Sequence, residues 1–157
     1  MPDMIKGSFR KALVGDVEPM MELVAAPSKE GRILPLTRLD LYGRLRDYFV
    51  YLDQSDRLQG ICGLHICWES LGEIRSLVVG PELRGGGIGS TLVRLCLEEA
   101  REMGLKKVFV LTYLPDFFTE LGFNPIDKEA LPHKIWADCI HCVHFPKCDE
   151  VALVQEL

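Results

Sequence analysis

The 157-residue sequence contains no apolar run approaching the roughly 18 uninterrupted residues that a membrane-spanning helix requires. Its first eight residues, MPDMIKGS, also lack the apolar core of a signal peptide. Positive charge is not in excess, because 18 Lys and Arg stand against 23 Asp and Glu, a formal net charge of -5. Nucleic acids and anionic membranes both require a basic footprint, so neither is expected as the main partner. We therefore expect a cytoplasmic protein that holds any anionic ligand by local geometry.

Internal repeats, low-complexity tracts and linkers are also missing. The length suits one compact domain, and 48% hydrophobic with 26% charged residues is typical of a globular protein. We predict a single domain over residues 1–157.

Strand and helix patterns alternate along the chain. Strands are predicted at residues 8–14, 49–52, 59–68, 73–79, 107–113, 134–137 and 151–155. Helices are predicted at residues 16–26, 37 to about 48, 88–103 and 115–121. The three strands between residues 49 and 79 indicate an antiparallel meander, so the expected fold class is α/β (α+β).

Glycine is concentrated just after the strand at 73–79. Four glycines fall within five positions, at 85, 86, 87 and 89. In a regular helix each would cost about 0.5–1 kcal/mol relative to alanine. Bare backbone amides at the positive end of a helix form an anion site, and Arg84 adds a charged donor at its edge. The alternative is a flexible turn. A dinucleotide site is less favoured, because no acidic residue follows a second strand at the required interval.

The spacing Arg84-x-x-Gly87-x-Gly89 resembles the acetyl-coenzyme A motif of the GNAT superfamily of N-acetyltransferases, and FTELGF at 118–123 is similar to its Tyr-x-x-x-Gly-Phe ending. The resemblance implies the GNAT fold, a mixed, mostly antiparallel sheet flanked by helices and splayed between strands four and five. It implies acetyl-CoA as cosubstrate. By the same resemblance, the pyrophosphate is held by the amides of Arg84, Gly85, Gly86, Gly87, Ile88, Gly89 and Ser90. The pantetheine is held by the backbone of Leu77, Val78 and Val79.

Longer segments resemble a narrower family, the short single-domain N-acetylglutamate synthases of bacterial arginine biosynthesis. They are GRILP at 31–35, EIRSLVV at 73–79, LPHKIWADC at 131–139 and CDEVAL at 148–153. This resemblance implies transfer of acetyl from acetyl-CoA to the α-amine of L-glutamate by direct attack. It also implies a homodimer, and no amino-acid-kinase-like domain of the kind found in the long forms.

Direct attack requires a neutral amine, an oxyanion donor and a proton for the leaving thiolate. Glu73 is the expected general base, directly or through water. The alternative for Glu73 is a salt bridge with Arg75 on the same strand face, worth about 0–1 kcal/mol at a surface. A backbone amide of Val78 or Val79 is the expected donor to the carbonyl oxygen.

The superfamily's usual acid is a tyrosine at the position that matches Phe118, and residues 117 and 118 are both phenylalanine. Tyr113 is the predicted substitute, although a tyrosine at a strand end is often a core residue with a wet hydroxyl. A thiol with a pKa near 8.5 leaves as an anion at a cost of about 2 kcal/mol at pH 7. The phenylalanine therefore does not exclude catalysis.

Glutamate carries two carboxylates, which favours cationic side chains at the site. The candidates are Arg75, Lys134 and Arg38. Related short synthases often carry a basic residue just after the Leu-Pro pair, where this chain has Leu36. His65 is expected to be a satisfied core residue rather than a catalytic one.

The six cysteines form two groups. Three are expected to be free core thiols, two of them on opposite faces of one strand: Cys62, Cys67 and Cys96. The other three crowd into ten positions with two histidines between them and supply enough ligands for zinc: Cys139, Cys142 and Cys148. Packing around Trp136 or a redox-sensitive patch is the alternative for this second group.

Two rivals stand beside acetylation of glutamate. One is acetylation of another small amine such as glutamine. The other is a non-catalytic acyl-CoA-binding or metal-sensing module, suggested by Phe118 and the cysteine cluster.

Overall fold

The computed structural model describes residues 6–33, 35–131 and 150–157. Within these ranges seven strands form one sheet in the order β1-β2-β3-β4-β5-β7-β6. The strands are β1 (Ser8–Lys11), β2 (Tyr48–Leu52), β3 (Leu58–Trp68), β4 (Leu71–Val79), β5 (Lys107–Thr112), β6 (Asn124–Pro125) and β7 (Val151–Glu156). The helices are α1 (Val17–Lys29), α2 (Arg38–Gly43), α3 (Ile88–Glu102) and α4 (Pro115–Glu120), with 3-10 turns at Val14–Asp16, Leu45–Asp47, Pro81–Leu83 and Lys128–Ala130. Only the β4–β5 pair is parallel among the described strands, which confirms the mixed, mostly antiparallel sheet.

Two helices differ from the sequence prediction. α1 continues past its expected end at Ala26, because Pro27 removes only one backbone donor and the next turn still closes: the Glu30 amide donates to the Ala26 carbonyl at 3.1 Å. The second helix ends at Gly43 instead of near residue 48, and a 3-10 turn then leads into β2. The strand β6 was not predicted, because two residues are too few to show an alternating pattern. The strand predicted at 134–137 lies outside the described residues.

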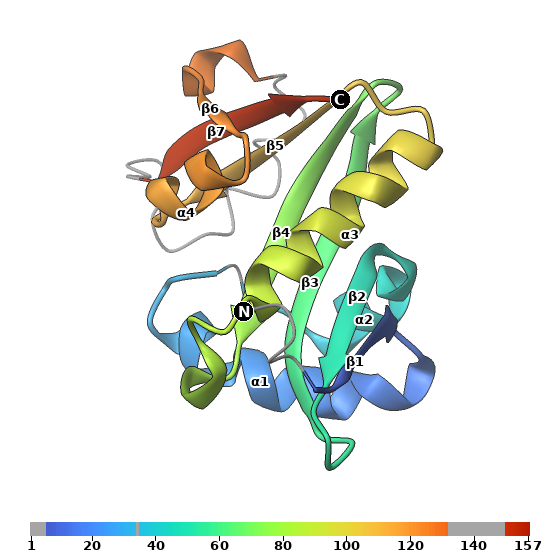
Figure 1. The fold of residues 1–157 in the computed structure, drawn as a ribbon. Coiled ribbons are helices and arrows are strands. Elements are labelled where there is room, and N and C mark those ends of the chain that lie inside the picture. Colours follow the sequence, from blue (N-terminus) through green and yellow to red (C-terminus); the bar gives the residue numbers. More distant parts are fainter. Residues whose placement is uncertain (1–5, 34, 132–149) are drawn as a thin grey trace.

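Helices cover both faces of the sheet (Figure 1). α3 packs on one face, where its buried Leu92 and Cys96 share a core with Leu64 and Ile74 of β3 and β4. α1 and α2 pack on the opposite face, in a second core. That core includes Met20, Leu41, Val50, Ile61 and Val78. None of the described helices is long and apolar enough to cross a membrane.

The three cysteines in the described ranges are free, as predicted. Cys62 and Cys96 are fully buried between β3 and α3, and interaction with the Cys96 thiol together with burial raises the pKa of Cys62. Both therefore behave as small apolar core residues. Cys67 packs near Phe109 on the opposite face of the sheet.

Strands β4 and β5 pair along only part of their length. Leu71–Ile74 pairs with Lys107–Val110, whereas β4 continues to Val79 and β5 to Thr112. The two strands therefore part after Ile74, which confirms the splay between the fourth and fifth strands.

A β-bulge at Ser76 lies where the strands part. Ile61 of β3 pairs with Val78, and Gly63 pairs with Arg75, so β4 has one residue more than β3 between the two pairs. Ser76 has a φ of 52°, a left-handed conformation that is uncommon outside glycine. The extra residue reverses the alternation: Ile74 packs toward α3, whereas Val78 packs toward α1.

Candidate active site

The glycine segment forms a tight turn that leads directly into α3. Gly85 and Gly87 have φ values of 85° and 89°, which side-chain-bearing residues adopt only at a cost, so glycine is required at both positions. Gly87 is also the N-cap of α3 and brings no side-chain oxygen to the first helical amides. The amides of Ile88, Gly89 and Ser90 have no partner inside a helix and lie at the positive end of its dipole. This geometry favours a preformed anion site over a flexible turn.

A cleft of about 710 Å³ connects this loop with the gap between β4 and β5. Its volume lies in the range of ligand pockets. Eight of the ten residues that the sequence assigns to the cofactor line it: Leu77, Val78, Val79, Arg84, Gly85, Gly87, Gly89 and Ser90. The other two lie in the same loop; Ile88 packs into the core, and a β-carbon on Gly86 would lie 3.4 Å from the Leu83 carbonyl oxygen.

The end of β4 offers backbone groups to the cleft. After Ile74 its β5 edge has no strand partner within the described ranges, whereas its other edge stays paired with β3 through Val78 and Val79. Arg84 folds back over this end, and its Nε donates to the Val79 carbonyl at 3.4 Å. Unpaired strand groups and the loop amides thus share one cavity.

Glu73 and Arg75 form a largely buried ion pair on the α1 face of β4. Arg75 Nε donates to Glu73 Oε1 at 2.6 Å, and the two side chains are 13% and 11% exposed, Arg75 first. A guanidinium at this distance favours the ionised carboxylate. The surface estimate of about 0–1 kcal/mol does not apply to a pair this buried. Neither residue lines the cleft, although the adjacent Ile74 and Ser76 do.

Tyr113 lines the cleft just beyond the end of β5 and is 36% exposed. Phe118 also lines it but is 2% exposed. Its ring makes edge-on contacts with Phe117, at 5.0 Å between centroids, and with Phe123, at 5.4 Å. Phe118 is therefore a core residue that lacks a hydroxyl, and Tyr113 carries the phenol at this wall.

Of the three residues predicted to bind the substrate, the two that the structure describes, Arg38 and Arg75, do not line the cleft. Arg38 is exposed on α2 and makes a bidentate ion pair with Glu18, with Nη2 to Oε2 at 3.0 Å. Arg75 is committed to Glu73. Lys134 lies outside the described residues.

Arg32 is the residue that the sequence reasoning missed. It lines the cleft from the end of α1, and its Nε lies 2.7 Å from Glu30 Oε2 with the side chain 43% exposed. Its place depends on α1 continuing past Pro27, which the sequence does not indicate. The available signal was its position in the GRILP segment, one of those that carry the family resemblance.

The predicted zinc ligands Cys139, Cys142 and Cys148 lie outside the described residues. Within the described part of the chain, no group of three or more His, Cys, Asp or Glu side chains could hold a metal ion.

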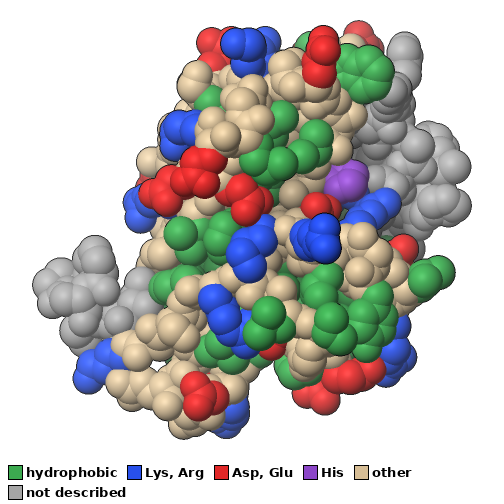
Figure 2. All heavy atoms as spheres, turned by 90° about the vertical axis from the view of Figure 1, so that its right-hand side faces the viewer, with side chains coloured by type: hydrophobic (Ala, Val, Ile, Leu, Met, Phe, Trp, Pro, Cys, Tyr) green, Lys and Arg blue, Asp and Glu red, His purple; other side chains and the backbone are tan. Residues whose placement is uncertain are grey.

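Charges of both signs are interspersed on the face drawn in Figure 2, with apolar patches between them. This face shows no large continuous basic surface, in line with the net charge of -5. Positive charge at the cleft comes instead from two described side chains, Arg32 and Arg84.

A glycine loop at a helix N-terminus that opens into a gap between two parted parallel strands defines the N-acetyltransferase class. The chain belongs to the acetyltransferase (GNAT) family, whose sequence profile matches residues 18–123. It is 36% identical over 148 residues to an uncharacterized N-acetyltransferase of Chlorobaculum tepidum, covering 94% of this chain and 95% of that protein. It is also 36% identical over 130 residues to the amino-acid acetyltransferase of Mycobacterium tuberculosis, covering 81% of this chain and 74% of that one.

Among solved structures, the fold is similar to N-acetylglutamate synthase from Neisseria gonorrhoeae complexed with coenzyme A and N-acetyl-glutamate. The TM-score is 0.87 at 25% sequence identity, and the match covers 96% of this chain but 35% of the other. The shared part is therefore about one third of that larger protein.

Proposed function

We propose that this protein transfers the acetyl group of acetyl-CoA to the α-amine of L-glutamate, the first step of arginine biosynthesis. The observation that carries the proposal is that one continuous cleft joins the glycine loop to the parted ends of β4 and β5. The relatives named amino-acid acetyltransferase and the synthase structure with bound coenzyme A support an amino acid as the acceptor.

The residues of the cleft suit coenzyme A. A pyrophosphate needs clustered donors and positive charge, which the amides of residues 84–90 and the Arg84 side chain supply. A pantetheine arm is an extended chain with amides, and the open edge of β4 at Leu77–Val79 offers matching backbone groups. The bound cosubstrate supplies an acetyl thioester that an amine can attack.

The chain's own residues would then manage protons and charge. Glu73 is the proposed general base and acts through water, because its carboxylate is held by Arg75 and lies next to the cleft rather than in its wall. A backbone amide of Val78 or Val79 stabilises negative charge on the carbonyl oxygen. Tyr113 is the proposed proton donor to the leaving sulfur.

We assign recognition of the substrate carboxylates to cationic side chains. Arg75, Lys134 and Arg38 stay candidates from the sequence, and we add Arg32 because it lies in the cleft wall. A carboxylate ligand would compete with Glu30 for the Arg32 guanidinium, whose planar donors suit either partner.

The decisive experiment is a steady-state assay of the whole chain with acetyl-CoA and a panel of amino acids. Turnover highest with glutamate supports the proposal, and higher turnover with glutamine or another amine replaces glutamate by that substrate. Binding of acetyl-CoA without transfer to any amino acid would instead favour the non-catalytic module.

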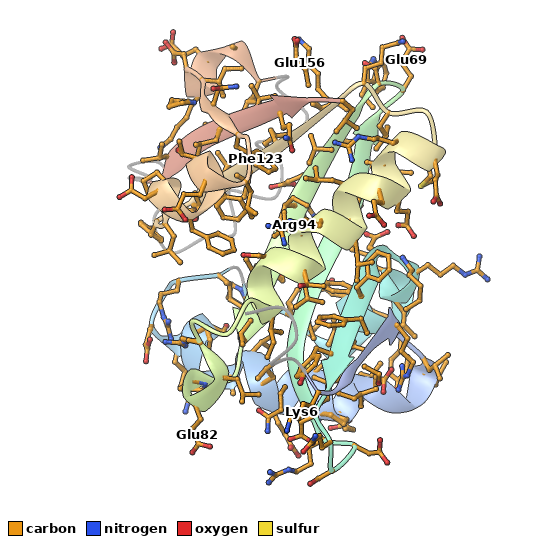
Figure 3. All side chains as sticks on the ribbon, viewed as in Figure 1. Lys6, Glu69, Glu82, Arg94, Phe123 and Glu156 are labelled. Atoms are coloured by element: carbon orange, nitrogen blue, oxygen red, sulfur yellow. The ribbon has the colours of Figure 1, made fainter. Side chains whose placement is uncertain are left out.

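The role of Glu73 is tested by Glu73→Gln, which keeps an acceptor for Arg75 but removes the base. We expect kcat to fall by about 100-fold or more with coenzyme A affinity unchanged. The matched control is Glu69→Gln, because Glu69 is exposed at the turn between β3 and β4, away from the glycine loop (Figure 3). An unchanged kcat in Glu73→Gln at saturating substrate would reduce Glu73 to a structural partner of Arg75.

Three further expectations belong to the same proposal. Zinc at Cys139, Cys142 and Cys148 is tested by repeating the assay with a chelator and then restoring zinc. Size measurements in solution test the homodimer, and fractionation of cells tests the cytoplasmic location.

A further inference from the structure

A chain of polar side chains crosses the face of the sheet that packs against α1. His65 of β3 lies directly opposite Glu73 of β4, and both point to this face because Ile61, two pleats before His65, packs against α1. Directly opposite residues of an antiparallel pair have β-carbons about 4.5–5.5 Å apart. The imidazole of His65 and the carboxylate of Glu73 are therefore neighbours.

His65 is held from its other side by Asp47. Its Nδ1 lies 2.8 Å from Asp47 Oδ2, and Asp47 ends the 3-10 turn that precedes β2. The two side chains are 29% and 26% exposed, so His65 reaches water and is not the core residue that the sequence suggests. A carboxylate on Nδ1 fixes that nitrogen as the donor and leaves Nε2 as the acceptor.

The proposed chemistry creates a need for such a group. Glu73 as a whole residue is 8% exposed and has little contact with water. A proton accepted by its carboxylate must leave before the next turnover. Its ion-pair partner Arg75 cannot take the proton, because a guanidinium stays protonated. The charged and titratable groups described around His65 are Cys67 from its own strand, Asp47 from the 3-10 turn, Tyr48 from β2, and Glu73 with Arg75 from β4.

We propose that His65, oriented by Asp47, passes the proton that Glu73 accepts from the substrate amine to solvent. This inference rests on the proposed function, since it takes Glu73 as the base. The amine N–H bond breaks as its proton moves to a water molecule, which passes a proton on to a Glu73 oxygen. The proton then passes to His65 Nε2, directly or through one water, while Nδ1–H stays on Asp47. The imidazolium releases a proton to water, which restores both side chains. Asp47 acts as a positioning residue.

The test is the pair of variants His65→Gln and Asp47→Asn in the whole chain, assayed with the amino acid that the wild type acetylates. We expect kcat to fall about tenfold or more in His65→Gln, with the KM for acetyl-CoA unchanged. Added imidazole buffer should restore the rate of His65→Gln in proportion to its concentration and leave the wild type unaffected. Asp47→Asn should show a smaller loss and a shifted pH–rate profile. Asp56→Asn is the control, because Asp56 is exposed in the turn before β3 and the charge change is the same.

Two results would overturn the relay. One is wild-type kcat in His65→Gln at every buffer concentration. The other is a loss that imidazole does not restore and that follows a lower unfolding temperature, which would mark His65 as structural. Both are distinguishable from failure of the proposed function, in which the wild type acetylates no amino acid or Glu73→Gln keeps full activity.

Discussion

Gly63 of β3 and Tyr48 of β2 lie opposite each other, and the Tyr48 ring fills the space that a side chain at position 63 would need. A β-carbon on Gly63 would come within 3.0 Å of Tyr48 Cε1. The ring position lets the Tyr48 hydroxyl contact Ser76 Oγ at 3.4 Å, so it reaches the bulge that borders the cleft. Burial raises the pKa of Tyr48, and the contacts with Ser76 and Arg75 only partly oppose this. The phenol is therefore neutral at pH 7.

Replacing Gly63 by alanine should consequently displace the Tyr48 ring. We expect Gly63→Ala to lower the free energy of unfolding by about 1–3 kcal/mol, the usual cost of overpacking a core. Gly43→Ala is the control, because a β-carbon there would meet nothing within 4 Å and the residue lies in a helix. Chemical denaturation of both variants makes the comparison, and equal stabilities would show that Tyr48 moves aside without cost.

The glycine loop can be separated from general backbone strain by two matched substitutions. Gly85 and Gly104 have φ values of 85° and 87°, and a β-carbon on either would meet nothing within 4 Å. Alanine should cost about 1–2 kcal/mol at each site. Only Gly85 lies in the cleft, at the start of α3, whereas Gly104 follows its end. We expect calorimetry to show weaker coenzyme A binding for Gly85→Ala alone; equal weakening in both would attribute the effect to strain.

Stability in acid should depend on Asp16. Burial opposes ionisation of this carboxyl, but two bonds from Arg10, at 2.6 and 3.1 Å, and one from the Leu13 amide at 2.7 Å outweigh it and lower the pKa of Asp16. A lowered folded-state pKa stabilises the fold above the unfolded value of about 3.9, and that contribution is lost as pH falls through the folded value.

Asp16→Asn should therefore cost about 1–3 kcal/mol at pH 7. The difference from wild type should shrink below about pH 4. Thermal unfolding between pH 2 and 7 measures it, and a difference independent of pH would mean that the packing of the side chain, not its charge, is what matters.

Loss of the Tyr113 hydroxyl should affect the chemical step and not binding. We expect Tyr113→Phe to reduce kcat about tenfold at pH 7, and less as pH rises past about 8.5, where a thiol leaves readily as an anion. Tyr42→Phe removes a hydroxyl from the exposed face of α2 and serves as control. A Tyr113→Phe enzyme with the wild-type pH–rate profile would show that the thiolate departs without an acid.

Features that depend on local pattern could be predicted from the sequence. The apolar stripe of α3 and the spacing of the glycines each depend on residue types that recur within a short segment. Both features are found where expected. The bulge could not be predicted, because strict alternation puts Ile74 and Val78 on one face and only pairing with β3 reveals the extra residue. Arg38 was expected at the cleft but pairs with Glu18 instead, whereas Arg32 lines the cleft without having been predicted there. The ion pair and the length of α1 decide these two positions, and neither is a local signal.

The extra residue at Ser76 divides β4 into two halves whose odd-numbered side chains face opposite sides of the sheet. The half before it directs Glu73 and Arg75 toward the α1 side, and the half after it directs Leu77 and Val79 toward the α3 side. Odd-numbered positions thus carry the proposed base on one side of the sheet and the proposed pantetheine contacts on the other. Without the bulge, strict alternation through Ser76 would place both sets on the same surface, although none of their side chains would change.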